Sequence, residues 1–516
     1  MQHYDVAVVG MGPVGSAAAT LLAHAGLRVV TVERDPEVYP LPRAVVMDGE
    51  VIRGFQRIGL GQTLADLLQP VLEHDRVGFA NSKRQWLFGS SLTNFANNGW
   101  PPMSMFDQPQ VDAFLRETAS SHVNVTSYNA HEFESFEDDG DNVLCKVRGI
   151  NDKIPHAFSA NYLLACDGAN SSIRRKLNIP WHDLGYDHDW LVVDVTVKDG
   201  HTLSRDTVQV CDPERLTTYV CTKDPYRRWE FKLNSGETAE HMLKAETIQQ
   251  LIDPWTPAHT YTIRRTAVYQ FHAAIAEHWR QGRVFLVGDA AHQTPPFLGQ
   301  GMNAGMRDAI NLAWKLPLVL TGKAHTELLD LYQAERAAHA KDLVQWAVDL
   351  GKLMEHLATT EAAENKGLPA PSPPAQGQTS GYGQGREAPP LRDGAVIIEQ
   401  VSDQGSTGYL FSQPLVKQNT EQFLLDELLG KGFAIVTRSE VELRLNAQSQ
   451  TIINQLNISI TSIENLTEIR GHFDRLFAHA SCVIVRPDRY VFGHTSASLN
   501  LNQLLVRLQQ QVFLSH

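Results

Sequence analysis

The sequence predicts a mixed α/β fold with a βαβ unit at its start, a mainly antiparallel sheet inserted into that first domain, and a small α/β domain at its end. The first observation is that the opening 35 residues read as strand, glycine-rich turn, helix and strand. The second is that residues 185–275 carry alternating, aromatic-rich stretches such as TYVCTKDPYRRWEFKL. The third is that strand and helix patterns return in residues 394–516.

These observations divide the chain of 516 residues into several units. The run GLPAPSPPAQGQTSGYGQGREAPP has too few apolar residues to pack by itself and predicts a linker. We expect a discontinuous first domain (1–180 and 276–365), an inserted sheet domain (181–275), the linker (366–393) and a C-terminal domain (394–516).

The composition excludes several classes of function. A net charge of -13 without clusters of Lys and Arg argues against a nucleic-acid partner. No stretch of 18 apolar residues and no signal peptide are visible, so we expect no membrane span. The 5 cysteines are scattered and show no metal-ligand spacing, which predicts a cytoplasmic protein with no metal site.

The turn after the first strand has the spacing of a dinucleotide-binding motif. Its glycines allow a sharp turn, a close approach of backbone to a pyrophosphate, and tight packing of helix on strand. An acidic residue at the end of the next strand can accept hydrogen bonds from a ribose. The candidate cofactor residues here are Gly10, Gly12, Pro13, Val14, Gly15, Glu33 and Arg34. These residues alone do not distinguish FAD from NAD.

Two later segments, Asp167-Gly168 and Gly288-Asp289, resemble the DG and GD motifs of the single-component FAD-dependent aromatic hydroxylases, the class A flavoprotein monooxygenases. The resemblance implies a Rossmann-like FAD-binding domain with an inserted substrate domain. It also implies that Asp289 contacts the ribityl chain, that the Pro-Pro-x-x-Gly-x-Gly run wraps the flavin, and that Asp167 lies near FAD and the nicotinamide. The cofactor residues that it adds are Arg43, Gln108, Asp167, Gly288, Asp289, Pro296, Gly299, Gly301, Met302 and Asn303.

Within that family the chain resembles most the branch of 3-(3-hydroxyphenyl)propionate and phenol hydroxylase-like enzymes. The phrases PLPRAV, RRWEF and RPDRYVFG carry this likeness, which spans essentially the whole chain. The branch has a thioredoxin-like C-terminal domain without a redox cysteine pair, and Cys482 indeed stands alone in this region. The phrase YQAERAAHA lacks the proline that usually follows Glu-Arg, so the substrate should not be inherited from the named enzymes.

The resemblance implies a reaction in which NADH or NADPH reduces FAD, dioxygen is captured as a flavin C4a-hydroperoxide, and one oxygen passes to a phenolic or heteroaromatic ring. The chemistry belongs to the flavin, and the protein supplies orientation and excludes water. A single dinucleotide fingerprint in the chain agrees with a nicotinamide that binds transiently.

The substrate should lie between the inserted sheet and the flavin, in a largely apolar pocket. The candidate lining residues are Trp190, Tyr219, Trp229, Phe231, Tyr269 and Pro296, although strand alternation sends only half of the sheet residues inward. No side chain is assigned as catalytic: His272 and Asp48 are weak candidates for a base, and His292 is interpreted as structural.

Other functions remain open at this point. The W-x-W-x-I-P signature of the flavin-dependent halogenases is missing. A flavin-dependent dehydrogenase or reductase acting on a polyketide or isoprenoid, and a non-catalytic FAD-binding sensor, are the alternatives to a monooxygenase. A homodimer is the commonest symmetric assembly, but the sequence does not fix the oligomeric state.

Overall fold

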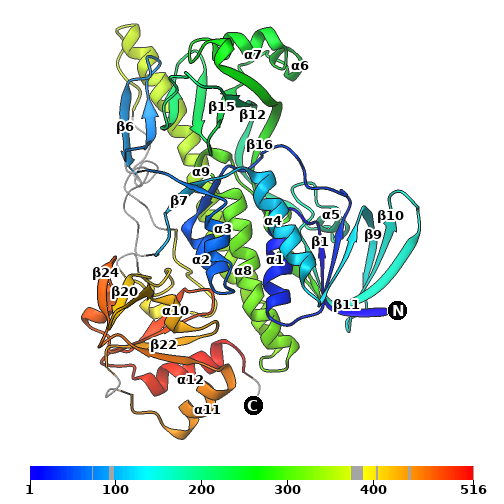
Figure 1. The fold of residues 1–516 in the computed structure, drawn as a ribbon, viewed down its shortest axis with the longest axis vertical. Helices are drawn as coiled ribbons and strands as arrows, with labels where there is room; N and C mark the ends of the chain where they lie inside the picture. Colours follow the sequence, from blue (N-terminus) through cyan, green and yellow to red (C-terminus); the bar gives the residue numbers. More distant parts are fainter. Residues whose placement is uncertain (73, 92–97, 373–387, 403–404, 440–442, 515–516) are drawn as a thin grey trace.

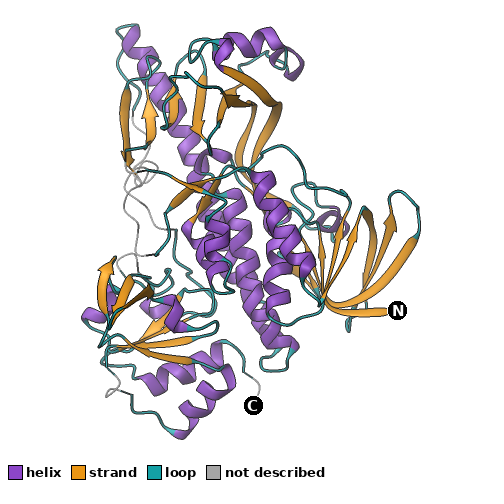
Figure 2. Ribbon diagram, viewed as in Figure 1, coloured by secondary structure: helices purple, strands orange, loops and turns teal. Residues whose placement is uncertain are grey.

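The computed structural model describes residues 1–72, 74–91, 98–372, 388–402, 405–439 and 443–514. A first sheet lies close to the N-terminus, and a second sheet lies at the top of the view in Figure 1. The C-terminal part, orange to red in Figure 1, lies at the lower left, and a group of helices fills the space between the three (Figure 2). The molecule is thus a mixed α/β protein in which the helices connect three bodies of sheet.

The first sheet is built around parallel strands, in the order β17-β18-β11-β1-β2-β8, with β10 and β9 continuing from β11. Its strands are β1 (Gln2–Val9), β2 (Val29–Glu33), β8 (Val125–Asn129), β9 (His131–Asp138), β10 (Val143–Gly149), β11 (Pro155–Ala165), β17 (Arg280–Gln281) and β18 (Val284–Leu286). The apolar run Val6–Val9 is buried because the sheet is covered on both sides. Since β11 pairs in parallel with both β1 and β18, the carboxyl ends of these three strands meet at one edge.

Helices and a small sheet cover this core. The helices are α1 (Pro13–His24), α2 (Gly49–Gln56), α3 (Gly61–Ala65), α4 (Gln108–Ser121), α5 (Ser172–Lys176) and α8 (Gly301–Leu320). The small sheet joins β3 (Val46–Asp48), β7 (Met103–Met105) and β4 (Gln69–Pro70). Helix α1 packs against both α4 and α8, and its buried Ala17, Ala18 and Ala19 allow this close approach.

The second sheet has the order β19-β16-β12-β15-β14-β13-β5-β6. Its strands are β5 (Arg76–Ala80), β6 (Trp86–Ser91), β12 (Trp181–Val197), β13 (Thr207–Cys211), β14 (Leu216–Cys221), β15 (Tyr226–Lys232), β16 (Tyr261–Ala276) and β19 (His292–Gln293). Strands β5, β6 and β19 lie outside the range 181–275 that the sequence indicated for this sheet, which corrects that boundary. Strand β5 pairs in parallel with β13, and such long-range pairing leaves no local pattern in the sequence.

Alternation of side chains gives this sheet two faces with different neighbours. The outer face packs on α6 (Ala239–Met242) and α7 (Ala245–Ile252), and its side chains include Val193, Tyr219 and Trp229. The opposite face turns toward the main core and toward α9 (Leu331–Asn365). We call this second surface the inner face, and its cross-strand neighbours are Phe79, Gln209, Thr218, Glu230, Val192, Ala267, Trp190 and Tyr269.

The C-terminal part combines a four-stranded sheet, β23-β22-β25-β26, with a three-stranded sheet, β21-β20-β24. Its elements are β20 (Leu415–Gln418), β21 (Glu421–Leu424), α10 (Asp426–Leu429), β22 (Ala434–Thr437), α11 (Ala447–Leu456), β23 (Ser459–Ser462), β24 (Thr467–Arg470), β25 (Cys482–Val485), β26 (Val491–His494) and α12 (Leu501–Gln511). Trp314 of α8 belongs to the same core cluster as Leu504 of α12, so this part packs directly on the central helices. Much of the predicted linker, residues 373–387, lies outside the described residues.

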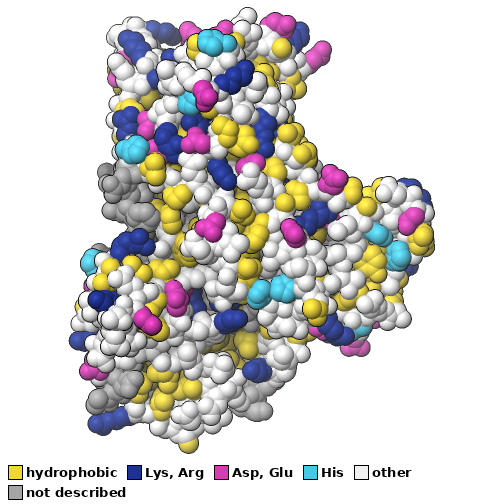
Figure 3. All heavy atoms as spheres, viewed as in Figure 1, with side chains coloured by type: hydrophobic (Ala, Val, Ile, Leu, Met, Phe, Trp, Pro, Cys, Tyr) yellow, Lys and Arg dark blue, Asp and Glu magenta, His cyan; other side chains and the backbone are white. Residues whose placement is uncertain are grey.

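Three further features concern membrane-spanning helices, possible metal ligands and surface charge. No helix among them is long and apolar enough to cross a membrane. Within the same residues, no group of three or more His, Cys, Asp or Glu side chains could hold a metal ion. On the face seen in Figure 3, Lys and Arg are interspersed with Asp and Glu and form no continuous basic surface.

Candidate active site

The glycine turn between β1 and α1 has the geometry that its spacing predicts. Gly10 has φ +94°, and a Cβ there would overlap the carbonyl oxygen of Cys166 at the end of β11. A Cβ on Gly15 would overlap the carbonyl oxygen of Gly10, so this glycine allows the helix to pack against the turn. In contrast, a Cβ on Gly12 would meet no atom within 4 Å. The turn therefore leaves open space at Gly12, where a ligand could approach the backbone.

Glu33, at the end of β2, holds this turn in place. Its Oε2 accepts a hydrogen bond of 2.6 Å from the Met11 N–H, and its Oε1 accepts one of 2.9 Å from the Asp35 N–H. The neighbouring Arg34 is exposed and pairs with Asp35 at 3.7 Å. Glu33 thus shapes the loop, whereas Arg34 makes no described contact with the other motif residues.

The two later motifs meet the glycine turn at the same sheet edge, because they follow β11 and β18. Asp167 accepts hydrogen bonds from the Ser172 and Ile173 N–H groups, yet its Oδ1 is buried without a partner. Asp289 is exposed to solvent at this edge. Gly288 has φ +64° and lies against Val14, so this turn also packs tightly on α1.

Two polar side chains fix the loops that complete this edge. Gln108 Oε1 accepts hydrogen bonds from the N–H groups of Arg43 (2.9 Å) and Ala44 (2.6 Å), and Gln108 therefore positions the loop that carries Arg43. Asn303 donates to the carbonyl oxygens of Val46 (3.1 Å) and Gly299 (2.8 Å). Both are among the cofactor residues that the resemblance implied, and each of them holds a loop of this edge.

The remaining residues of the proline-glycine run surround the start of α8. Gly299 has φ +63°, in the left-handed region that favours glycine, and its N–H donates to the Pro296 carbonyl. Gln300 caps the helix, Gly301 is its first residue, and Met302 is buried. The N-terminus of α8 therefore lies at this loop. The N–H groups of its first turn have no partner within the helix and favour a negative charge nearby.

The candidate bases are occupied or exposed. Asp48 forms an ion pair with Arg307 and also accepts a hydrogen bond from the Val51 N–H, as the N-cap of α2. His272 is exposed and lies 3.4 Å from Asp187. His292 is fully buried and contacts Asp308 at 2.7 Å, and Asp308 in turn accepts a hydrogen bond from the Gly288 N–H.

The structure separates the aromatic candidates for a substrate site. Trp190 lies on the inner face with its ring 5.3 Å from Phe297 of the proline-glycine loop, and Tyr269 is its cross-strand neighbour. Tyr219, Trp229 and Phe231 belong to the outer-face core instead, which Ile248 of α7 also joins. The sequence could not distinguish these sets, because alternation fixes which residues share a face but not which face turns inward.

Sequence reasoning missed Glu230 on β15. Glu230 has 5% of its surface exposed, its Oε1 lies 3.7 Å from Arg228 Nη1, and no described residue donates a hydrogen bond to it. Desolvation raises its pKa to about 7, against the lowering effect of Arg228. The sequence did contain a signal for Glu230, because the charged residues Arg228, Glu230 and Lys232 alternate with aromatic residues along this strand.

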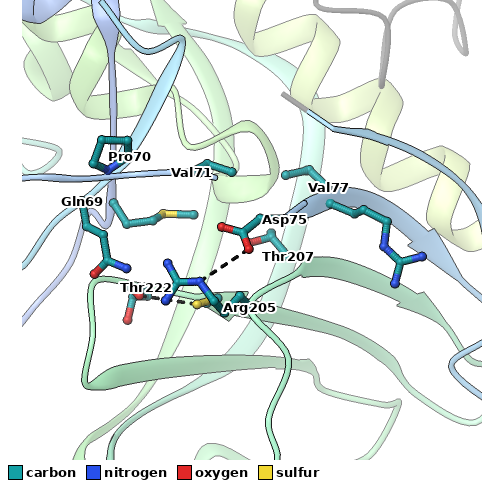
Figure 4. Close-up of a pocket in the computed structure, with 11 residues that line it drawn as sticks. Gln69, Pro70, Val71, Asp75, Val77, Arg205, Thr207 and Thr222 are labelled. Carbon is teal, nitrogen blue, oxygen red and sulfur yellow. Dashed lines mark hydrogen bonds and ion pairs between the residues drawn. The ribbon is translucent and has the colours of Figure 1, made fainter. Parts of the chain in front are cut away.

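A separate, small pocket lies where β13 begins and β14 ends (Figure 4). Asp75 and Arg205 point toward one another inside it, at 3.5 Å, and the Thr222 hydroxyl is buried there without a partner. None of the lining residues belongs to the three motifs. This pocket is therefore distinct from the sheet edge described above.

Comparison with known proteins shows the family to which the chain belongs. The model of a family described as "FAD binding domain" matches residues 3–347, which is more than half of the chain. The chain belongs to this FAD-binding family. Residues 408–511 match a second model, described as "HcaD C-terminal domain". The residues present fit the cofactor, because open space at Gly12, the unpartnered Asp167 Oδ1 and the accessible Asp289 meet at one edge.

Two relatives that match most of this chain are named hydroxylases. A "probable NADH-specific resorcinol 4-hydroxylase" of Rhodococcus jostii (strain RHA1) is 32% identical over 95% of this chain and 91% of its own. A 3-(3-hydroxy-phenyl)propionate/3-hydroxycinnamic acid hydroxylase of Escherichia coli (strain 55989 / EAEC) is 31% identical over 94% of this chain and 91% of its own. The crystal structure of aklavinone-11 hydroxylase with FAD and aklavinone has the same fold, with a TM-score of 0.82, 24% identity and 99% of both chains covered.

Proposed function

We propose that this protein is a monooxygenase that uses FAD, NADH and dioxygen to hydroxylate a small phenolic substrate. The edge where the turns after β1, β11 and β18 meet is the proposed FAD edge. The observation that carries the proposal is that the loops of this edge contact the inner face of the second sheet. Arg228 Nη1 donates to the Arg43 carbonyl at 2.7 Å, and Trp190 packs on Phe297. A buried aromatic surface thus adjoins the cofactor edge, as a hydroxylase requires.

The cofactor residues of the proposal are those that the sheet edge gathers. The open backbone at Gly12 and the N-terminus of α1 would receive the pyrophosphate. Asp289 would hydrogen-bond the ribityl chain, and the loop at Pro296–Leu298 with the start of α8 would border the flavin ring. When bound there, FAD supplies the redox chemistry, taking electrons from the nicotinamide and delivering them to dioxygen.

The protein's own contribution is to orient the substrate and to exclude water. Trp190 and Phe297 form an apolar wall between the two bodies, which would limit the loss of reduced oxygen as peroxide. The names of the two relatives support a phenolic ring as substrate, and the name of the Rhodococcus protein supports NADH as the reductant. No two cysteines that the structure describes form a disulfide bond, and this supports a reducing, cytoplasmic location.

The test is to follow NADH oxidation, peroxide release and incorporation of oxygen-18 together, with the purified FAD-loaded protein and a panel of phenols. The proposal predicts oxidation that a phenol stimulates, labelled product and little peroxide. NADPH run in parallel tests the choice of reductant. Bound FAD with a product that carries no label would support a dehydrogenase instead, and FAD that no compound turns over would support a sensor. Size measurement of the same sample tests whether the protein is a homodimer, which we also propose.

A further inference from the structure

The inner face carries one row of polar side chains between its apolar neighbours. Thr218 of β14 lies directly opposite Glu230 on one side and Gln209 on the other. Its hydroxyl donates a hydrogen bond of 2.5 Å to Gln209 Oε1. All three residues are buried, with 5% of Glu230, 3% of Thr218 and 2% of Gln209 exposed. We call this row, Gln209–Thr218–Glu230, the polar floor.

The polar floor has unused hydrogen-bonding capacity at both ends. No described residue donates to the Glu230 carboxyl, and no described residue accepts from the Gln209 amide nitrogen, whose oxygen is engaged by Thr218. Burial of such groups is unfavourable unless a partner satisfies them. One end thus offers an acceptor and the other a donor.

The neighbours of Glu230 place the polar floor beside the FAD edge. Arg228, two residues earlier on the same strand, donates to the Arg43 carbonyl. Trp190, which neighbours Val192 on the same face, packs on Phe297. Burial raises the pKa of the Tyr186 phenol, and the charges of Glu355 and Glu230 raise it further. The Tyr186 ring also contacts Phe297 edge-on. Both cofactor loops thus flank the polar floor.

The described cations of the inner face are already paired. Arg228 binds Asp194 at 2.7 Å, Arg265 lies 3.4 Å from the same carboxylate, and Lys232 pairs with Glu355 of α9. A carboxylate on the substrate would therefore meet the Glu230 charge without a free cation to balance it. A neutral hydroxyl group avoids this repulsion and can donate to Glu230.

We propose that the polar floor selects a neutral aromatic ring with two hydroxyl groups, one donating to Glu230 and the other accepting from Gln209. Glu230 and Gln209 stand two strands apart, or roughly 10 Å, which matches one ring with a hydrogen bond at each end. The inference rests on the proposed function, since it takes the inner face as the substrate site. Glu230 is a specificity residue in this account.

The test measures ligand binding to the oxidised FAD-loaded protein by calorimetry, without NADH. The probes are resorcinol, which carries two hydroxyls, and 3-hydroxybenzoate, which replaces one of them with a carboxylate. We expect the wild-type protein to bind resorcinol at least tenfold more tightly than 3-hydroxybenzoate. We expect Glu230→Gln to weaken resorcinol binding about tenfold, because a charge-assisted hydrogen bond becomes a neutral one. The same change should reduce the preference for resorcinol over 3-hydroxybenzoate. Gln209→Leu, a second variant, should weaken resorcinol binding as well.

The pH dependence provides a second readout. Resorcinol binding should strengthen as the pH rises from 6 to 8 in wild type, because Glu230 loses its proton near pH 7, and it should not do so in Glu230→Gln. The other charged groups facing Glu230 are Arg228, Lys232, Asp194, Arg265 and Glu355, and His188 lies 3.5 Å from Glu355. His188→Gln is therefore measured beside Glu230→Gln, and its resorcinol binding should keep the pH dependence of the wild-type protein.

Glu214→Gln is the matched control, because Glu214 is exposed in the turn between β13 and β14. It should bind both probes as wild type does. The proposal is overturned if wild type prefers 3-hydroxybenzoate, if neither probe binds, or if Glu230→Gln and Gln209→Leu bind resorcinol unchanged. Binding that depends on Glu230, without hydroxylation under turnover, would overturn the proposed function and leave the polar floor standing. Hydroxylation by the wild-type protein, with unaltered resorcinol binding in Glu230→Gln and Gln209→Leu, would overturn the polar floor and leave the proposed function standing.

Discussion

The Tyr490 hydroxyl donates a hydrogen bond of 2.8 Å to Glu50 Oε1, joining the C-terminal part to helix α2 beside the FAD edge. The other Glu50 oxygen accepts from Arg307 Nε at 2.6 Å, and Arg307 Nη1 donates to Gln300 Oε1 at 3.0 Å. A continuous chain of hydrogen bonds thus runs from residue 490 to the N-cap of α8. The nearby segment Arg486–Tyr490 is anchored in turn, since Arg486 pairs with the buried Glu335 of α9 at 2.8 Å.

Replacing Tyr490 with Phe removes the first bond of this chain. We expect the free energy of unfolding to fall by about 1–2 kcal/mol, because the bond joins a buried hydroxyl to a carboxylate. We expect the dissociation constant for FAD to rise severalfold, since Gln300 borders the cofactor edge. Urea unfolding of the apoprotein and FAD titration measure the two effects. Tyr409→Phe, also in the C-terminal part, is the comparison, and an equal loss of FAD affinity there would contradict the link.

Gly12→Ala should separate FAD binding from folding. A Cβ at Gly12 meets no protein atom within 4 Å, and its φ of -68° suits alanine, so the apoprotein should keep its thermal midpoint. The methyl group would occupy the space where the pyrophosphate approaches, and FAD affinity should fall at least tenfold. Gly15→Ala should instead destabilise the apoprotein itself, because its Cβ would overlap the Gly10 carbonyl. Unchanged FAD affinity in Gly12→Ala would argue against this cofactor position.

Trp190 and Trp229 are both fully buried but lie on opposite faces of one sheet. Each change to Leu should lower the free energy of unfolding by about 2–4 kcal/mol, since both remove a large buried ring. Only Trp190→Leu should also weaken binding of the phenolic substrate, because Trp190 contacts Phe297 at the FAD edge. Chemical unfolding and substrate titration of the two variants test this. A loss of substrate affinity confined to Trp229→Leu would assign the site to the outer face.

Glu230→Gln should make the protein more stable at neutral and alkaline pH. The folded state raises the pKa of Glu230 to about 7 from an unfolded value near 4.5, so folding favours the protonated form. Its contribution to stability is present below pH 4.5 and is lost as the pH rises to 7. The variant's advantage over wild type should therefore grow across this window, to about 3 kcal/mol at pH 8. Urea unfolding at pH 5 and pH 8 measures it, and a constant difference would show that Glu230 is not desolvated.

Some features of this protein could be predicted from local sequence. The turn at Gly10–Gly15 is set by neighbouring residues, because Gly10 and Gly15 have a conformation or contacts that no other residue allows. The later turns at Asp167 and Gly288 follow short apolar strands, and strands of this kind predict a parallel sheet whose carboxyl ends meet. These three turns could therefore be predicted from the sequence as candidate cofactor sites.

Other features depend on pairing between distant segments, and no local pattern encodes them. Strands β5 and β6 belong to the second sheet because β5 pairs with β13, which lies more than 100 residues away in the chain. Gln108 and Asn303 were recognised as site residues, but only the structure showed that they hold the loops of Arg43 and Gly299.

The sequence by itself determined the three turns of the proposed FAD edge, the alternation of the inserted strands and the class of fold. Tertiary structure decided which face of the second sheet turns toward that edge, and so which of Trp190 and Trp229 borders it. It also decided that Glu230, Thr218 and Gln209 share one row, and that Tyr490 contacts Glu50. The physical reason is that backbone conformation depends on a few adjacent residues, whereas the orientation of a face is fixed only when all the packed elements bury their apolar sides together.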